Sequence, residues 1–167
     1  MNEIMTDFIV RACAKPFFNL IHSAGKARYS RMKDALEREK PDYARLGMDV
    51  RDYIYDMPRV MAAADLVLCR AGASTLAELT AMGKPAILVP SPNVTNNHQE
   101  KNARVLEQAG GAAVVLEADS SGQELFRIAC GILHDETRRS SMETAMASLG
   151  IRDAAERILQ LILEISG

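Results

Sequence analysis

Short apolar segments alternate along this chain with longer segments whose apolar residues recur at helical spacing. The apolar segments that predict strands are 17–25, 48–57, 65–72, 84–92 and 112–118. The segments that predict helices are 28–40, 58–64, 74–83, 98–110, 121–135, 136–148 and 153–165, with a further helix marked by Ile4, Phe8, Ile9 and Ala12. Because parallel strands need helical crossovers, this alternation predicts an α/β fold, a Rossmann-like doubly wound parallel sheet with helices on both faces.

The chain begins with a predicted helix, whereas a doubly wound sheet normally begins with its first strand. No repeat or linker divides the sequence, so residues 1–167 are expected to form one domain from which that strand is absent. The predicted strands 17–25 and 65–72 would then face each other across a gap. Either these two strands pair directly or another chain fills the gap, and self-association through an exposed sheet edge is expected.

Composition excludes several classes of function. The 20 basic and 22 acidic residues are mixed along the chain, the net charge is −2 and aromatic residues make up 5%, which argues against nucleic-acid binding. The N-terminus lacks the features of a signal peptide and no run of about 18 apolar residues occurs, so we expect the isolated chain to be soluble. Cys13, Cys69 and Cys130 are widely spaced in apolar surroundings, which favours buried thiols over a metal or redox site. No cofactor is expected.

The first candidate site lies where the predicted strand 65–72 passes through Gly72 into a helix. Free backbone N–H groups of Ala73, Ser74 and Thr75 at a helix start, with the positive end of the helix dipole behind them, are typical of a phosphate or diphosphate cradle. Glu78 lies one turn further along the same face, where a carboxylate can accept hydrogen bonds from ribose hydroxyls. The alternative is that Ser74 and Thr75 only cap the helix and that Glu78 is a solvated helix residue.

Three further strand ends carry weaker signals. The polar segment 89–103 leads into a helix, and its amide side chains suit recognition of neutral sugar hydroxyls, although any polar loop with a helix cap has a similar composition. Within it, His98 is expected to be a capping or surface residue. His22 could face the same crevice, but a simple turn is the favoured interpretation of its segment. The backbone of Ile54 can offer N–H and C=O groups to a base edge, and a core isoleucine explains that residue equally well.

Sequence motifs of nucleophilic and metal-dependent catalysis do not occur here. The sequence holds no GxSxG, Walker A, HExxH, CxxC or GxGxxG pattern and no DxD pair at a predicted strand end. No catalytic residue and no metal ligand is therefore assigned. Neutral donors around a phosphate cradle fit group transfer from a nucleotide-activated donor, in which stabilisation of the leaving diphosphate provides the catalysis.

The segment CRAGASTLAELTAMGKPAILVPSPNVTNNHQEKNA, residues 69–103, closely resembles the MurG family of bacterial N-acetylglucosaminyltransferases. The likeness extends along the chain through DYIYDMPRVMAAADLVLCRAG and the closing IRDAAERI, but it covers only the C-terminal half of that family. The resemblance implies the GT-B architecture, in which two Rossmann-like domains enclose the active site. The C-terminal domain would bind UDP-N-acetylglucosamine, and the N-terminal domain would bind the lipid acceptor and the membrane.

The resemblance also implies which residues bind the donor: Ile54, Ala73, Ser74, Thr75, Leu76, Glu78 and Gln99, with Asn102 as a weaker candidate. In this assignment the main chain of Ile54 binds uracil, Glu78 holds the ribose hydroxyls and Gln99 binds the sugar. The residues at the helix start contact the diphosphate and ribose. The family's catalytic base is expected in the N-terminal domain.

The reaction that the resemblance implies transfers N-acetylglucosamine from UDP-N-acetylglucosamine to lipid I, forming lipid II for peptidoglycan. It takes place at the cytoplasmic face of the bacterial inner membrane, to which the family binds peripherally. The family's first strand, its Gly-Gly-Ser loop and the acceptor domain have no counterpart in this sequence. We favour a fragment of a full enzyme, inactive alone. The alternatives are one half of a split-gene transferase that needs a partner subunit, and a non-catalytic nucleotide-binding module.

Overall fold

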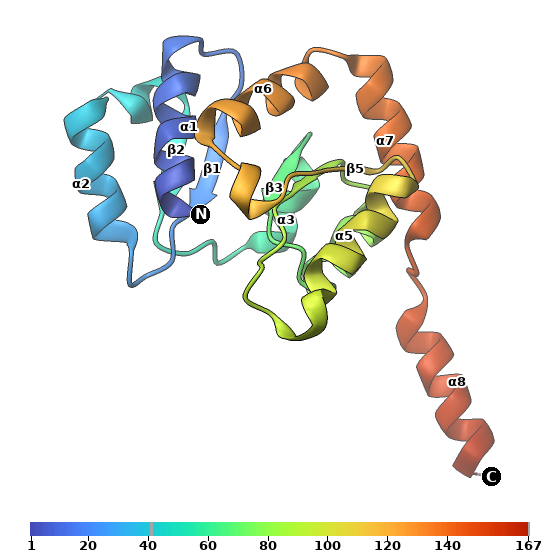
Figure 1. The fold of residues 1–167 in the computed structure, drawn as a ribbon. Helices are drawn as coiled ribbons and strands as arrows, with labels where there is room; N and C mark the ends of the chain where they lie inside the picture. The colour runs from blue at the N-terminus through green and yellow to red at the C-terminus, as the bar shows by residue number, and fades with distance from the viewer. Residues whose placement is uncertain (41, 167) are drawn as a thin grey trace.

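The computed structural model describes residues 1–40 and 42–166, apart from the side chain of Ser166. Its strands are β1 (Leu20–Ser23), β2 (Met48–Arg51), β3 (Val67–Cys69), β4 (Ala86–Leu88) and β5 (Ala112–Val114). Its α-helices are α1 (Asn2–Ala14), α2 (Tyr29–Glu39), α3 (Met57–Ala63), α4 (Ala73–Met82), α5 (His98–Gln108), α6 (Gly122–Leu133), α7 (Glu136–Leu149) and α8 (Ala154–Ser166) (Figure 1). All strand pairs are parallel, which confirms the predicted α/β fold class.

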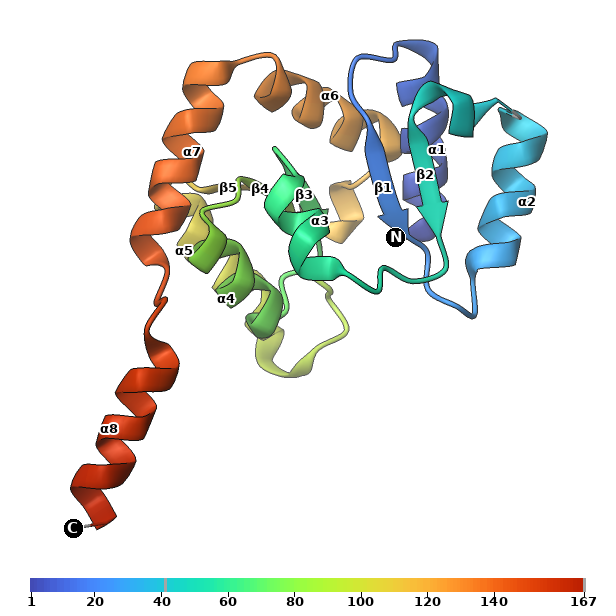
Figure 2. The same ribbon diagram turned by 180° about the vertical axis from the view of Figure 1, so that it is seen from behind.

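The strands form two separate sheets, as Figure 2 shows from behind. β1 pairs with β2 from Leu20 opposite Met48, and β3, β4 and β5 form the second sheet in that order. Among the described residues β1 does not pair with β3, so of the two alternatives that the sequence left open, direct pairing of these strands does not occur.

Alternating residues of β4 divide the core into two layers. Ile87 packs on one face in a cluster that α1, α2 and α6 complete with Ile9, Leu36 and Leu125. Leu88 faces the opposite way, into a cluster that includes Leu79 of α4. This alternation follows from the two-residue repeat of a strand, and it places helices on both faces as predicted.

Strands are shorter in the structure than the apolar segments that predict them. In the segment 84–92 only Ala86–Leu88 forms a strand, because Pro85 and Pro90, on either side of it, have no N–H group to donate to a ladder. In the segment 17–25, Gly25 adopts φ +81°, a left-handed conformation that turns the chain out of β1. The helices agree more closely with prediction, and α4 ends at the predicted Gly83, which adopts φ +65°.

The last helix, α8, extends away from the rest of the molecule (Figure 1). Its large apolar side chains are all more than half exposed, namely Ile158, Leu159, Leu161, Ile162, Leu163 and Ile165. Across the part of the chain that the structure describes, no helix is both long and apolar enough to cross a membrane.

The three cysteines are free thiols. Cys13 is buried, as predicted, whereas Cys69 and Cys130 are only partly buried. Burial raises the pKa of the Cys69 thiol to about 12, so this residue is protonated and unreactive at neutral pH. Among the described residues no group of three metal-ligating side chains comes together.

Candidate functional site

The N-terminal end of α4 presents unpaired backbone donors. The helix begins directly after Gly72, whose carbonyl accepts the first helical hydrogen bond from Leu76 at 3.0 Å. The N–H groups of Ala73, Ser74 and Thr75 bond to none of the residues that the structure describes. These three donors therefore remain available to an anion, with the positive end of a 10-residue helix behind them.

Ser74 and Thr75 do not cap this helix. Residue 72, at the cap position, is a glycine, and no side chain accepts a hydrogen bond from the first turn. Ser74 is exposed and Thr75 is partly buried, and their hydroxyls form no hydrogen bond with described residues. The capping interpretation of these two residues is thus wrong, while the ligand-binding interpretation stays a prediction.

Glu78 lies one turn further along α4, at the surface. Within residues 1–40 and 42–166, its carboxylate has neither an ion-pair nor a hydrogen-bond partner. A carboxylate that is free on the face of Ser74 and Thr75 can accept from the vicinal hydroxyls of a ribose whose phosphate lies at the helix start.

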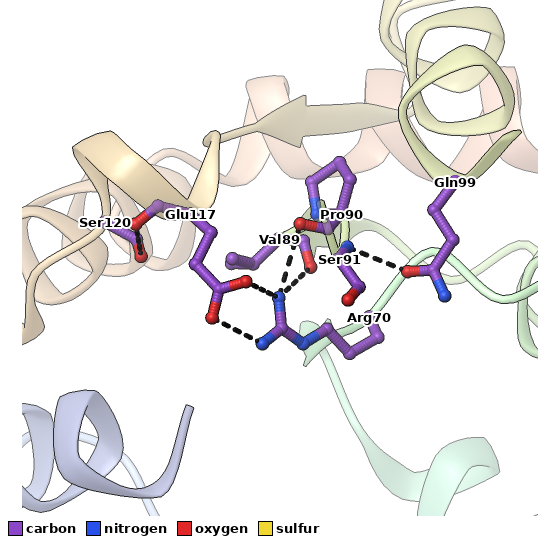
Figure 3. Close-up of polar contacts among 7 residues, drawn as sticks. All are labelled: Arg70, Val89, Pro90, Ser91, Gln99, Glu117 and Ser120. Carbon is purple, nitrogen blue, oxygen red and sulfur yellow. Dashed lines mark hydrogen bonds and ion pairs between the residues drawn. The ribbon is translucent and has the colours of Figure 1, made fainter. Parts of the chain in front are cut away.

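Gln99 is held in place by the loop that follows β4. Its Oε1 atom accepts a hydrogen bond from the backbone N–H of Ser91 at 2.9 Å (Figure 3). Because Oε1 is engaged in this way, the Nε2 amide group is the part of Gln99 that points to other partners. That group has none among the described residues, so it can donate to a sugar hydroxyl or carbonyl.

An ion pair that sequence reasoning missed joins the ends of three strands. Arg70, directly after β3, donates to Glu117, which follows β5, at 3.0 Å from Nη1 and 2.8 Å from Nη2. Nη1 also lies 3.2 Å from the carbonyl of Val89 and 3.3 Å from that of Pro90, directly after β4 (Figure 3). The hydrogen bond from Arg70 lowers the pKa of the Glu117 carboxyl, which keeps the pair charged.

Ile54 follows β2 in the loop that leads to α3, and its side chain is buried. Its backbone N–H and C=O bond to no described residue, so they are free to meet a base edge. The neighbours Tyr53 and Tyr55 are exposed and stack edge to face, with ring centroids 5.0 Å apart. Lys26, from the loop after β1, places Nζ about 6 Å from both ring centroids.

The structure places the remaining candidates as follows. Leu76 is buried in the core on α4, so only its backbone is near the helix start. Asn102 lies on α5 one turn after Gln99, partly buried and without a partner among the described residues. The helix start after β3 and the loop after β4 both lie at the carboxyl ends of strands in the three-stranded sheet. Ile54 follows β2, which belongs to the other sheet.

The histidines offer no evident general base. The Nδ1 atom of His98 lies 2.9 Å from the carbonyl oxygen of Thr95, to which it can donate, in agreement with its expected local role. His22 lies within β1 rather than in a turn, which corrects the sequence interpretation. Burial, followed by the nearby N-terminal amine, lowers the pKa of His22 to about 4, so its ring is neutral at pH 7. His134 follows α6, and its ring lies against that of Phe17, with centroids 4.1 Å apart.

A hollow of about 790 Å³ lies between the end of α1 and α6. It is lined by Arg11, Lys15, Phe17, Phe126, Cys130 and His134, among others. None of the predicted donor-binding residues borders it, so the candidate site is an open edge of the sheet and not this hollow.

Comparison with known proteins decides the family. The model of the glycosyltransferase family 28 C-terminal domain matches residues 1–158. The chain belongs to this family. The family membership agrees with the resemblance found in residues 69–103, and it makes the chain the counterpart of a C-terminal domain.

Two relatives extend the comparison along the chain. A protein of Listeria monocytogenes named UDP-N-acetylglucosamine--N-acetylmuramyl-(pentapeptide) pyrophosphoryl-undecaprenol N-acetylglucosamine transferase is 43% identical over 148 residues, which is 89% of this chain and 40% of the relative. A protein of the same name from Acetivibrio thermocellus is 42% identical over 166 residues, 99% of this chain and 44% of the relative. The chain thus spans about two fifths of the length of these relatives.

Solved structures share the fold. The crystal structure of Acinetobacter baumannii MurG matches with a TM-score of 0.81 at 23% identity, over 98% of this chain and 45% of that one. A glycotransferase of kitacinnamycin matches with a TM-score of 0.67 at 20% identity, over 96% of this chain and 39% of that one. Both likenesses extend over nearly all of the family 28 domain described here.

Proposed function

We propose that residues 1–167 form the donor-binding domain of an inverting N-acetylglucosaminyltransferase that uses UDP-N-acetylglucosamine. The observation that carries the proposal is the open start of α4, where the N–H groups of Ala73, Ser74 and Thr75 are unpaired beside the free carboxylate of Glu78. The family match over residues 1–158 and the names of the bacterial relatives support this choice of donor.

In this proposal the parts of the donor bind to segments that follow different strands. The diphosphate lies against the amides of α4, the ribose hydroxyls bond to Glu78, and the backbone of Ile54 receives the uracil edge. The Nε2 group of Gln99 donates to the N-acetylglucosamine, while Ser91 keeps its Oε1 atom occupied. Asn102 is a secondary candidate for the same sugar.

The chemical step joins an acceptor hydroxyl to the anomeric carbon of the sugar. The bond from that carbon to the diphosphate oxygen breaks, UDP leaves with the electron pair, and the hydroxyl proton passes to a base. The residues at the start of α4 stabilise the negative charge that develops on the leaving diphosphate, since their unpaired N–H groups can donate to it. We place the base and the acceptor site in polypeptide outside this chain.

The acceptor that the relatives' names suggest is lipid I, which the transfer converts into lipid II for peptidoglycan. The full protein would then work as a peripheral protein at the cytoplasmic face of the bacterial inner membrane. Incubating the chain with lipid I and UDP-N-acetylglucosamine tests this division of labour. We expect no lipid II above background from the chain alone, because positioning of the acceptor contributes up to roughly 7–11 kcal/mol to such reactions. Robust turnover by the chain alone would contradict the proposal.

Adding a separately expressed acceptor domain from a family member separates the alternatives. Restored turnover supports the donor half, whether it is part of one chain or one of two subunits. UDP binding without turnover in that mixture favours a non-catalytic nucleotide-binding module instead.

A further inference from the structure

The hollow between α1 and α6 is separate from the proposed donor site. Its volume of about 790 Å³ is within the range of about 300–1,000 Å³ that is typical of small-molecule sites. Phe17, on its border, lies just before the amino end of β1, whereas the proposed donor site lies at the carboxyl ends of strands. A ligand in this hollow would therefore contact none of the residues proposed to bind the donor.

The packing of α1 against α6 shapes the hollow. The two helices lie side by side (Figures 1 and 2), and at the start of α6 a side chain in place of Gly122 would collide with Asp7 and with the backbone of Phe8. Further along α6, Phe126 and Cys130 border open space instead. Two walls of the hollow are therefore helices whose other faces the core holds in place.

One part of the hollow is apolar. Phe17 is 41% exposed, and Phe126 and the thiol of Cys130 form further parts of the wall. Burial raises the pKa of the Cys130 thiol, while a backbone hydrogen bond and the nearby charge of Lys15 lower it. The net effect is a rise, so the thiol is protonated at pH 7 and adds no negative charge to the wall.

The charged side chains around the hollow are all basic. Arg11, Lys15 and Arg127 line it, and no carboxylate occurs among the described residues that do so. The whole chain, by contrast, holds 22 acidic and 20 basic residues. The excess of positive charge is therefore a local property of this hollow.

Ion pairs with neighbouring carboxylates neutralise two of these three cations. The Nε atom of Arg11 donates to both carboxylate oxygens of Asp7, at 2.9 and 3.0 Å, and its Nη groups have no partner among the described residues. Arg127 donates to Glu124 from Nε and Nη2. Lys15 pairs with no residue that the structure describes. One positive charge thus remains uncompensated, and it matches a ligand with a single negative charge.

We propose that this hollow binds a small organic monocarboxylate with an apolar ring system. The rings would lie against Phe17 and Phe126, and the carboxylate would accept hydrogen bonds from Nζ of Lys15 and a free Nη group of Arg11. A carboxylate fits better than a phosphate ester with a charge of about −1.5 to −2, because only one positive charge is uncompensated here.

A simpler role for Lys15 competes with this proposal. Lys15 is the C-cap residue of α1, where a positive charge interacts favourably with the helix dipole. If that were its only role, loss of the charge would lower the stability of the fold slightly and leave ligand binding unchanged. The test must therefore measure both quantities.

The experiment uses naphthoate as the probe and naphthalenemethanol as a neutral molecule with the same rings. Titrations of the full chain without nucleotide are followed by calorimetry and by NMR shifts of the backbone amides. We expect saturable binding of naphthoate, with the largest shifts at Lys15, Phe17, Phe126 and Cys130. The alcohol should bind at least about tenfold more weakly, because hydrogen bonds to a charged acceptor are stronger.

Two variants separate the charge from the apolar wall. Lys15→Met keeps a long side chain without its charge and should weaken naphthoate binding at least about fivefold, with little effect on the alcohol. Lys101→Met, at an exposed position of α5 outside the hollow, is the matched control and should change neither affinity. Ala14→Trp adds a large ring at an exposed position of the wall and should abolish binding of both probes. Urea unfolding of each variant reports whether the fold is intact.

Several results would overturn the proposal. They are absence of saturable naphthoate binding, equal affinity for naphthoate and the alcohol, and unchanged affinity in Lys15→Met. Shifts confined to α8 would show adsorption to its exposed apolar side chains and would also contradict it. Binding of vesicles of anionic phospholipid without binding of free naphthoate would assign these cations to a membrane surface instead. None of these results depends on whether the chain binds a nucleotide.

Discussion

Arg70 and Glu117 form a two-pronged ion pair across 47 residues of sequence, and this pair ties together the carboxyl ends of β3 and β5. Because Arg70 also bonds to the carbonyls of Val89 and Pro90, it holds the start of the loop in which Ser91 anchors Gln99. This partly buried pair therefore supports the side of the sheet where the donor is proposed to bind.

Replacing Arg70 with methionine should destabilise the fold by about 1–3 kcal/mol, because it leaves a partly buried carboxylate and two carbonyls without their donor. Urea unfolding measures this loss. The matched control is Arg127→Met, which breaks the exposed pair with Glu124 and should cost clearly less stability than Arg70→Met. Equal effects of the two substitutions would mean that the Arg70 pair is an ordinary surface contact.

His22 should make stability depend on pH. Its pKa is lowered to about 4 in the folded chain from an ordinary value of 6.5, so the unfolded chain binds more protons between these values. The free energy of unfolding should therefore be highest above about pH 6.5 and should fall by about 3 kcal/mol as the pH falls to 4. Urea midpoints across this range should fall more steeply for the native chain than for His22→Phe.

An exposed histidine provides the control for that slope. His134→Gln removes a surface side chain and leaves His22 in place, so the dependence on pH that His22 causes should remain. A His22→Phe protein with an unchanged slope would show that other groups, such as the carboxylates, cause all of the acid sensitivity.

Several of these features follow directly from the sequence and others do not. The alternation of strands and helices, the open helix start at Ala73–Thr75 and the position of Gln99 after a buried strand could all be read from local patterns. Apolar periodicity and glycine or proline stops are local properties, and they predicted these elements correctly. The strands were predicted too long, because apolar residues such as Phe17 and Phe18 pack against other aromatic rings and do not pair in the sheet.

Long-range pairing accounts for what sequence reasoning missed. No local pattern connects Arg70 with Glu117, although an arginine directly after one strand and a glutamate after another are a weak signal. The register of β1 likewise placed His22 in a strand, with Nε2 buried and unpartnered, where a turn had been expected. The separation of β1 from β3 likewise depends on long-range packing, since residues of both strands contact one core cluster with α1 and α6, and no single segment encodes it.

Glu78→Gln should weaken UDP binding by about 1–3 kcal/mol, the range for a hydrogen bond to a charged group. Most of that loss should vanish with a nucleotide that lacks the ribose hydroxyls, since the carboxylate is proposed to bind them. Calorimetry on both nucleotides provides the comparison. Glu143→Gln, an exposed glutamate on α7, is the control that should leave affinity unchanged, and unchanged affinity in Glu78→Gln would identify Glu78 as a solvated residue.

The substitution Gln99→Glu distinguishes the roles of the Oε1 and Nε2 atoms of this side chain. A carboxylate can still accept from the N–H of Ser91, so the loop and the fold should stay intact. It has no N–H to donate to the sugar, so affinity for UDP-N-acetylglucosamine should fall by about 1 kcal/mol or more while affinity for UDP changes little. Gln108→Glu, at the end of the same helix, should change neither. Equal losses for both ligands would place Gln99 against the nucleotide rather than the sugar.

Titration of the chain with UDP, ADP and GDP, observed by calorimetry and by NMR shifts of the backbone amides, tests the central claim most directly. The proposed site predicts saturable binding of UDP, tighter than that of ADP or GDP, with the largest shifts at Ala73, Ser74 and Thr75 and a further shift at Ile54. Equal affinity for the three nucleotides would contradict the role of Ile54 in reading uracil. No binding, or shifts confined to residues away from the start of α4, would contradict the donor site itself.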